Sequence, residues 1–94
     1  RLPVVRRDLA VVVADTLPVQ EILTALNGAR PAHVDTIGLF DVYRGPGIEP
    51  DKKSLAILVL MQDTERTLTD VEIDATVAGL LQVLASRFGA TLRQ

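Results

Sequence analysis

The sequence predicts an α+β fold of one domain, with four strands and two helices in the order βαββαβ. Three observations predict it. Residues 7–14 are rich in β-branched side chains and nearly continuous in their apolarity, and residues 53–62 place apolar side chains on both faces of an extended segment, as buried strands do. They recur at helical spacing after Pro18 and again after Thr69. At 94 residues the chain is long enough for one hydrophobic core and too short for two.

The first two elements are a buried strand and a helix. Residues 7–14 are rich in β-branched side chains, which is typical of a central strand covered on both faces. Residues 15–18 then turn the chain, and Pro18 suits the first position of a helix. The helix is indicated by apolar residues at helical spacing, and Asn27 and Gly28 begin to close it; the apolar residues are Val19, Ile22, Leu23 and Leu26.

The next two elements are strands joined by a long loop. Residues 33–43 read as the second strand and residues 53–62 as the third. The intervening residues 44–51 are rich in turn formers and too numerous for a tight hairpin. Alternation places two sets of residues on opposite faces of the third strand: Leu55, Ile57, Val59 and Met61 on one, and Ser54, Ala56, Leu58 and Leu60 on the other.

The second helix has the clearest start signal. Thr69 and Glu72 have the spacing of a capping box, and Gly89 is placed to end the helix. One apolar stripe lies between them, made by Ile73, Val77, Leu80, Leu81, Leu84 and Phe88. Residues 90–93 supply a short last strand. This order is the ferredoxin-like arrangement, an antiparallel four-stranded sheet with two helices on one face and the other face open.

The register of the second strand decides which side chains lie on the open face. If Phe40 and Val42 belong to the core, then Asp41 and Tyr43 face outward, next to Ser54 on the third strand. Ile37 and Leu39 share the parity of Asp41 and Tyr43, so simple alternation cannot bury all the apolar residues. A bulge near Gly38, or partial cover of the open face, would resolve this. Leu58 and Leu60 on the open face indicate burial against a neighbouring domain.

Charge and composition restrict the function. Ten basic and twelve acidic residues give a net charge of −2, whereas a free-standing RNA-binding domain is usually basic, so we expect weak binding in isolation. Residues 63–74 carry a local charge of −4 at the start of the second helix, where acidic residues suit the helix dipole. No apolar run is long enough to span a bilayer. The absence of cysteine excludes disulfides and is compatible with the reducing cytoplasm. Because the chain starts at Arg1, we expect a fragment of a longer multidomain protein.

Catalytic, cofactor and metal sites are not supported. His33 is the one histidine, and a structural role is its ordinary interpretation. Residues 45–47 lack the lysine spacing of a phosphate-binding loop. The acidic residues of 63–74 lack the glycine and ligand periodicity of a calcium loop, so a solvated helix start is the better interpretation.

Asp41, Tyr43 and Ser54 form the most informative group. A tyrosine ring offers a stacking platform for a base, worth about 1–3 kcal/mol. A carboxylate beside it can accept hydrogen bonds from the N1–H and N2–H₂ edge of guanine, and a serine hydroxyl can add one more. The alternative is a surface aromatic residue, with Asp41 paired to Arg44 or Lys53.

Five strings of residues occur in a specific order and spacing along nearly the whole chain: Arg7-Asp8-Leu9-Ala10, Leu39-Phe40-Asp41-Val42-Tyr43-Arg44-Gly45, Lys53-Ser54-Leu55-Ala56, Arg66-Thr67-Leu68-Thr69-Asp70 with Glu72, and Phe88-Gly89-Ala90 with Leu92-Arg93. Together they resemble the ferredoxin-fold anticodon-binding domain of phenylalanine–tRNA ligases. Leu58 and Leu60 depart from this family, in which we expect more polar residues at these positions.

The resemblance implies a non-catalytic domain at the C-terminus of a bacterial β subunit, or of a single-chain organellar enzyme. It implies binding to the anticodon stem-loop of the phenylalanine tRNA, whose anticodon is GAA. Tyr43 would stack on the first anticodon base, and Asp41 and Ser54 would contact that guanine. Further RNA contacts are expected from Arg44, Lys53, Arg66 and Arg93. Aminoacylation with ATP and Mg²⁺ would belong to the α subunit of the full heterotetramer, and this domain itself would need no cofactor.

Two rival functions remain. An amino-acid-sensing regulatory domain of the same fold generally has a glycine in the turn after the first strand, and residues 15–18 have none. An acylphosphatase-like enzyme would need a phosphate-binding loop with an arginine at the same place, and that loop is absent.

Overall fold

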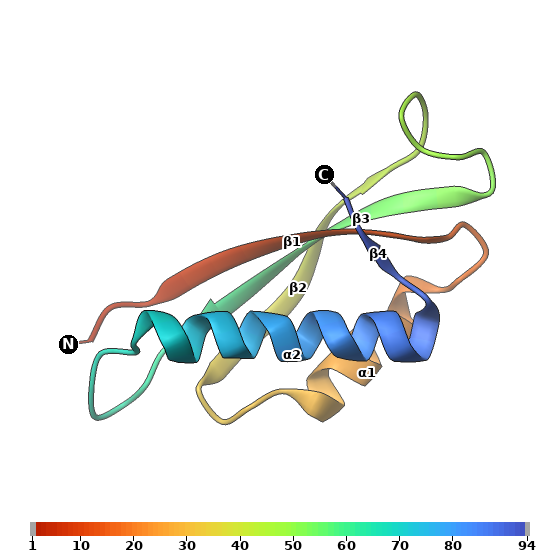
Figure 1. Cartoon of the computed structure of the whole chain (residues 1–94). Coiled ribbons are helices and arrows are strands. Elements are labelled where there is room, and N and C mark those ends of the chain that lie inside the picture. The colour runs from red at the N-terminus through yellow and green to blue at the C-terminus, as the bar shows by residue number, and fades with distance from the viewer. Residues whose placement is uncertain (1, 94) are drawn as a thin grey trace.

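The computed structural model describes residues 2–93, which fold into one antiparallel sheet and two helices. The order is β1 (Val5–Ala14), α1 (Val19–Ala29), β2 (Val34–Tyr43), β3 (Lys52–Met61), α2 (Asp70–Phe88) and β4 (Thr91–Leu92). The strands lie in the order β2-β3-β1-β4, and every neighbouring pair is antiparallel. Both helices lie on the same side of the sheet (Figure 1). The predicted ferredoxin-like βαββαβ fold is therefore confirmed.

The element boundaries differ slightly from those predicted. β1 begins at Val5, two residues before the predicted start, and β3 lies one residue earlier at both ends. Pro18 is the residue before the first turn of α1 and not its first helical residue, because its extended backbone (φ −66°, ψ 131°) belongs to the cap position. The helix continues past Gly28 to Ala29.

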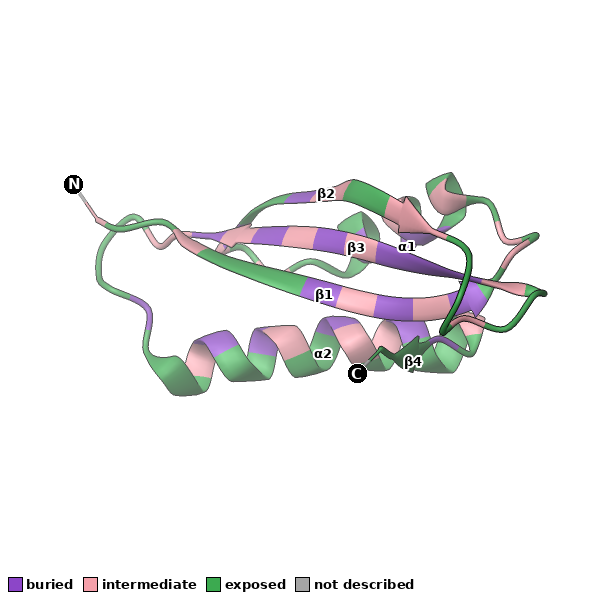
Figure 2. Cartoon of the chain, turned by 90° about the horizontal axis from the view of Figure 1, so that it is seen from above, coloured by how far each residue is buried: buried purple, intermediate pink, exposed green. Residues whose placement is uncertain are grey.

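The core lies between the sheet and the helices. Burial alternates along β1 and β3, as Figure 2 shows, because successive side chains point to opposite faces of the sheet. The sheet contributes Leu9, Val11, Val13, Leu55, Ile57, Val59 and Met61, and the helices contribute chiefly Ile22, Leu26, Ile73, Leu80 and Leu84. Each fully buried leucine or isoleucine stabilises the fold by about 1.5–3 kcal/mol relative to exposure.

Both ends of α2 are capped as the sequence predicts. The Glu72 amide donates to Thr69 Oγ1 at 3.2 Å, and the Thr69 amide donates to Glu72 Oε1 at 2.9 Å, which completes the capping box. Gly89 follows the last turn in the left-handed region (φ 65°), where glycine is favoured, and its amide donates to the Ala85 carbonyl. These caps satisfy backbone groups that the helix itself leaves unpaired.

A β-bulge sets the register of β2. Leu39 lies opposite Ile57, but the register then shifts, so that Asp41 lies opposite Ala56 and Tyr43 opposite Ser54. The extra residue is Phe40, two residues beyond the predicted position at Gly38. After this extra residue, even-numbered residues of β2 face the core in place of odd-numbered ones. Ile37, Leu39 and Val42 therefore all pack on the core face. A second shift lies between Val34 and Thr36.

Phe40 corrects one expectation. Its ring was expected in the core, but it is 48% exposed. The bulge is the physical reason, because the unpaired residue leaves the alternation of the strand. Asp41 and Tyr43, in contrast, lie on the predicted open face beside β3.

Candidate nucleic-acid interface

The open sheet face carries a row of side chains that the register brings together from three strands. Asp41, Ala56 and Ala10 lie opposite one another on β2, β3 and β1. Arg93 extends this row, because its amide donates to the Ala10 carbonyl at 2.8 Å just beyond β4. The neighbouring row contains Tyr43 and Ser54. Since both alanines are small, they leave the surface low enough for the Arg93 side chain to cross the sheet.

Tyr43, Ser54 and Arg93 form the centre of this surface. The Arg93 guanidinium carbon lies 4.8 Å from the centroid of the Tyr43 ring, a cation–π distance. Arg93 Nη1 also donates to Ser54 Oγ at 3.4 Å, and Ser54 is buried beneath it. Three of the predicted site residues therefore lie in one cluster, with Asp41 two residues from Tyr43 on the same face.

The loop after β2 holds the Tyr43 ring in place. The Tyr43 hydroxyl donates to the Pro46 carbonyl at 2.8 Å. Gly45 adopts a positive φ of 135°, and a side chain there would begin 3.2 Å from the Tyr43 hydroxyl. The ring is thus fixed at its polar end, which lowers the entropy that a stacking partner has to remove.

Lys53 is not on this surface. It is 5% exposed, and its ammonium donates to the Leu17 carbonyl at 2.6 Å on the helix side of the sheet. Alternation along β3 points Lys53 away from Ser54, so the structure does not place its side chain on the open face with the other predicted site residues. Arg44 is exposed at the end of the sheet and forms an ion pair with Asp15. Neither cation pairs with Asp41 as the alternative interpretation supposed.

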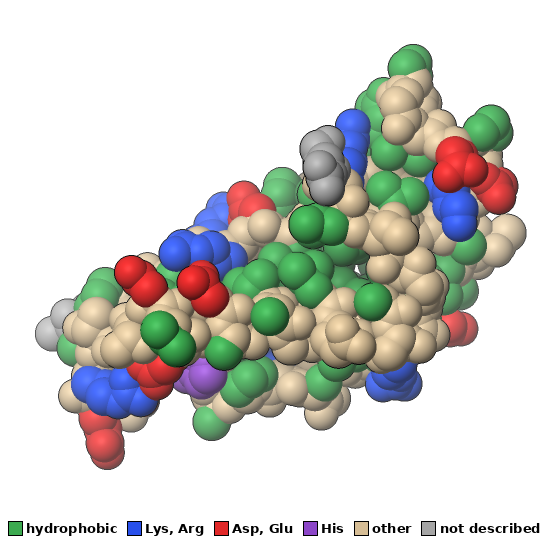
Figure 3. Space-filling model, viewed as in Figure 1, with side chains coloured by type: hydrophobic (Ala, Val, Ile, Leu, Met, Phe, Trp, Pro, Cys, Tyr) green, Lys and Arg blue, Asp and Glu red, His purple; other side chains and the backbone are tan. Residues whose placement is uncertain are grey.

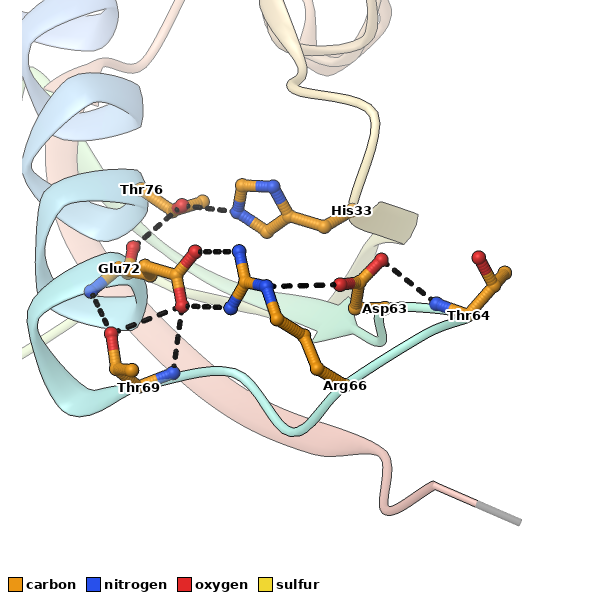
Figure 4. Close-up of polar contacts among 7 residues, drawn as sticks. All are labelled: His33, Asp63, Thr64, Arg66, Thr69, Glu72 and Thr76. Carbon is orange, nitrogen blue, oxygen red and sulfur yellow. Dashed lines mark hydrogen bonds and ion pairs between the residues drawn. The ribbon is translucent and has the colours of Figure 1, made fainter.

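Arg66 lies away from the cluster, beyond the end of β3 that is remote from Ser54. Its guanidinium donates to both carboxylate oxygens of Glu72, at 2.6 and 2.5 Å, and lies 3.6 Å from Asp63 (Figure 4). These bonds lower the pKa of Glu72 to about 2 and raise the pKa of Arg66. Basic and acidic side chains are mixed at this end of the molecule in Figure 3. The structure therefore assigns Arg66 to the start of α2 and does not bring it near Tyr43.

His33 also belongs to this end of the molecule. Its Nε2 lies 2.6 Å from Thr76 Oγ1, whose own hydroxyl donates to the Glu72 carbonyl at 2.9 Å (Figure 4). Because the hydroxyl proton is used for the carbonyl, His33 Nε2 is the donor in the first contact. The histidine thus links the segment before β2 to α2, which is the structural role expected of it.

Sequence reasoning missed two residues of the open face. Arg6 and Phe40 lie together there, with the guanidinium carbon 5.3 Å from the ring centroid. The available signal was that simple alternation places Leu39 and Asp41 on the same face, which a bulge near this point of β2 would resolve. Over residues 2–93, no three histidine or carboxylate side chains converge as metal ligands, and no helix is long and apolar enough to cross a membrane.

The fold and this surface define a class: a ferredoxin-like domain with helices on one sheet face and an exposed, partly aromatic second face. Within this class, the chain belongs to the ferredoxin-fold anticodon binding domain family, whose model matches residues 1–93.

Curated relatives are phenylalanine–tRNA ligase β subunits. Those of Nitrosospira multiformis, Thiobacillus denitrificans and Aromatoleum aromaticum are 50%, 52% and 46% identical over 93 residues. Each match covers 99% of this chain and 12% of the relative. The chain therefore corresponds to about an eighth of these proteins.

Proposed function

We propose that the chain binds the anticodon loop of the phenylalanine tRNA through its open sheet face, as the C-terminal domain of a bacterial phenylalanine–tRNA ligase β subunit. The observation that carries the proposal is the cluster of Tyr43, Ser54 and Arg93, with Asp41 beside it, on the open face of a domain of this family. The identity of the relatives as β subunits of this ligase supports the choice of tRNA.

Each residue of the cluster has a chemical role. The Tyr43 ring stacks on the first anticodon base, for about 1–3 kcal/mol. The Asp41 carboxylate accepts from the N1–H and N2–H₂ groups of guanine, and Ser54 adds a hydroxyl contact. Arg93 is exposed and touches Ser54 at only 3.4 Å, so it can move aside for the base and then bind a phosphate with a charge-assisted bond. Arg44 adds a second cation at the same end of the sheet.

The domain contributes binding, and the chemistry of the ligase takes place elsewhere. ATP, Mg²⁺ and phenylalanine would be used by the α subunit, in a cytoplasmic heterotetramer that contains this domain. The domain's part is to position the tRNA, which lowers the entropy cost of bringing the acceptor end to the catalytic site.

The turn after β1 argues against the alternative function of amino-acid sensing. The Asp15 amide donates to the Asp51 carbonyl at 2.8 Å, and the Leu17 carbonyl accepts from Lys53. The turn is therefore tied to the 44–51 loop and to β3, and these backbone groups are not available to a ligand.

The test compares Tyr43→Ala with Tyr43→Phe in the complete ligase. Tyr43→Ala removes the stacking surface, so kcat/KM for tRNA should fall by about 5- to 150-fold, the equivalent of about 1–3 kcal/mol. Tyr43→Phe keeps the ring and should lose much less. ATP–pyrophosphate exchange with phenylalanine is the control and should be unchanged in both variants. Equal tRNA kinetics for Tyr43→Ala and the unmodified enzyme would contradict the proposal.

A further inference from the structure

We propose that Phe40 and Arg6 form a second base-binding subsite on the open face, for an unpaired RNA base next to the one that stacks on Tyr43. This inference rests on the proposed function, because it concerns the same RNA and the same face. The Phe40 ring belongs neither to the hydrophobic core nor to the cluster of Tyr43, Ser54 and Arg93.

The β2 bulge turns the Phe40 side chain away from the core. Phe40 is the extra residue of the β2 bulge and has no partner on β3. Bulges of this kind re-aim a side chain and concentrate next to functional sites. The ring is 48% exposed, whereas Ile37, Leu39 and Val42 on the same strand pack against the core. A half-exposed phenylalanine gives up burial energy, and an aromatic ligand would recover it.

Arg6 gives the ring a polar partner on the same face. Arg6 lies opposite Leu60 on β3, and Leu60 belongs to the face that carries Ser54. The Arg6 guanidinium carbon is 5.3 Å from the Phe40 centroid, and its Nε donates to Asp8 Oδ1 at 2.8 Å. Asp8, Leu58 and Gly38 lie opposite one another on β1, β3 and β2. Because Gly38 has no side chain, this row leaves room for the Arg6 side chain to extend across β3 toward Phe40.

The pair repeats the arrangement at Tyr43. In both cases an aromatic ring from β2 lies under a guanidinium that crosses the open face from the far side of β3, at 4.8 Å for Tyr43 and 5.3 Å for Phe40. In both cases a polar side chain holds the arginine: Ser54 for Arg93, and Asp8 for Arg6. Bases stack on aromatic rings and on arginine planes in single-stranded RNA recognition, so each pair is a platform of this kind.

The spacing of the two platforms suits successive bases. Phe40 and Tyr43 are three residues apart on β2, which is about 10 Å at the rise of a strand and somewhat less across a bulge. Asp41 lies between them on the same face. Sheet-based RNA-binding domains stack two or three neighbouring bases in this way.

A protein partner fits this surface less well. Leu58 and Leu60 make its floor partly apolar, but Arg6 and Asp8 retain 53% and 52% of their side-chain exposure. A dry protein interface would have to desolvate this ion pair, which is costly. A base with polar edges and a phosphate nearby leaves the pair solvated and gives Arg6 an anionic neighbour.

The test uses tRNA carrying 2-aminopurine at the second or third anticodon position, with the complete ligase, so that the first-position guanine proposed to contact Asp41 is kept. Stacking on an aromatic ring quenches the fluorescence of 2-aminopurine. Phe40→Ala should relieve the quenching at the second or third position and weaken tRNA binding by about 5- to 150-fold, the value of one stacked base. Phe40→Tyr keeps an aromatic ring and should therefore retain both the fluorescence quenching and the tRNA affinity. Tyr43→Ala should weaken tRNA binding, because its ring stacks on the first-position guanine.

Arg87 provides a matched control, because its guanidinium lies 5.8 Å from the Phe88 ring at the end of α2. Arg6→Gln should weaken tRNA binding and Arg87→Gln should not. If Tyr43→Ala weakens binding but Phe40→Ala changes neither fluorescence nor affinity, the subsite is refuted and the proposed function stands. If neither variant has an effect, both fail. A defect in subunit assembly with unchanged fluorescence would assign the patch to a protein partner and refute the subsite.

Discussion

Phe40→Ala distinguishes the structure from simple strand alternation. The structure predicts a small loss in the free energy of unfolding, whereas a ring placed in the core by alternation predicts a large one. A fully buried phenylalanine contributes about 1.5–3 kcal/mol by burial, and this ring is 48% exposed, so about half of that is at stake. The contact with Arg6 adds about 0.5–1 kcal/mol at an exposed site. Phe40→Ala should therefore lower the free energy of unfolding by about 1–2.5 kcal/mol. A phenylalanine in the core would cost about 3–5 kcal/mol.

Urea denaturation of the 94-residue chain measures this difference, with Leu55→Ala as the control. Leu55 lies on the core face and is fully buried, so its truncation should cost about 2–5 kcal/mol. A loss for Phe40→Ala that reaches 3 kcal/mol and equals the loss for Leu55→Ala would refute the reasoning. It would mean that the ring packs in the core and that the bulge lies elsewhere on β2.

Three further predictions concern residues on the helix side. Lys53→Ala should cost about 1–3 kcal/mol of stability, measured by denaturation, because it leaves the Leu17 carbonyl unpaired; a loss of tRNA affinity with full stability would contradict this. Thr69→Ala should cost about 0.5–2 kcal/mol by removing the helix cap, whereas Thr67→Ala at an exposed neighbouring position should be neutral. Glu72 has a folded-state pKa of about 2, below its ordinary 4.5, so its contribution is complete above pH 4.5 and is lost as the pH falls toward 2. Glu72→Gln should remove this part of the acid dependence in denaturation curves, and an unchanged dependence would show that the Arg66–Glu72 pair does not act on folding.

The elements could be predicted from sequence because their signals are local. Periodicity located the long strands and the two helices, and the capping box and Gly89 fixed the ends of α2. The bulge was different. The alternation of β2 indicated either a bulge near Gly38 or partial cover of the open face, and only the pairing with β3 shows a bulge and places it at Phe40.

The candidate site was predicted in part for the same reason. Tyr43 and Ser54 share a face by alternation, so the strands alone place them together. Lys53 could have been excluded, because it has the parity of Leu55 and must face the helices. The contacts of Arg93 and Arg66 depend on register across strands and on the path of a loop, which no local pattern contains.

Direct reading of the anticodon by the open face is the central claim, and an NMR titration of this domain tests it most directly. The domain is titrated at low salt with the GAA anticodon stem-loop and with a stem-loop that carries a different first base. The account predicts chemical-shift changes centred on Asp41, Tyr43 and Ser54 that are larger with GAA. Equal changes with both loops, or changes confined to the groove lined by Thr24, Gly28 and Phe88 on the helix side, would contradict it.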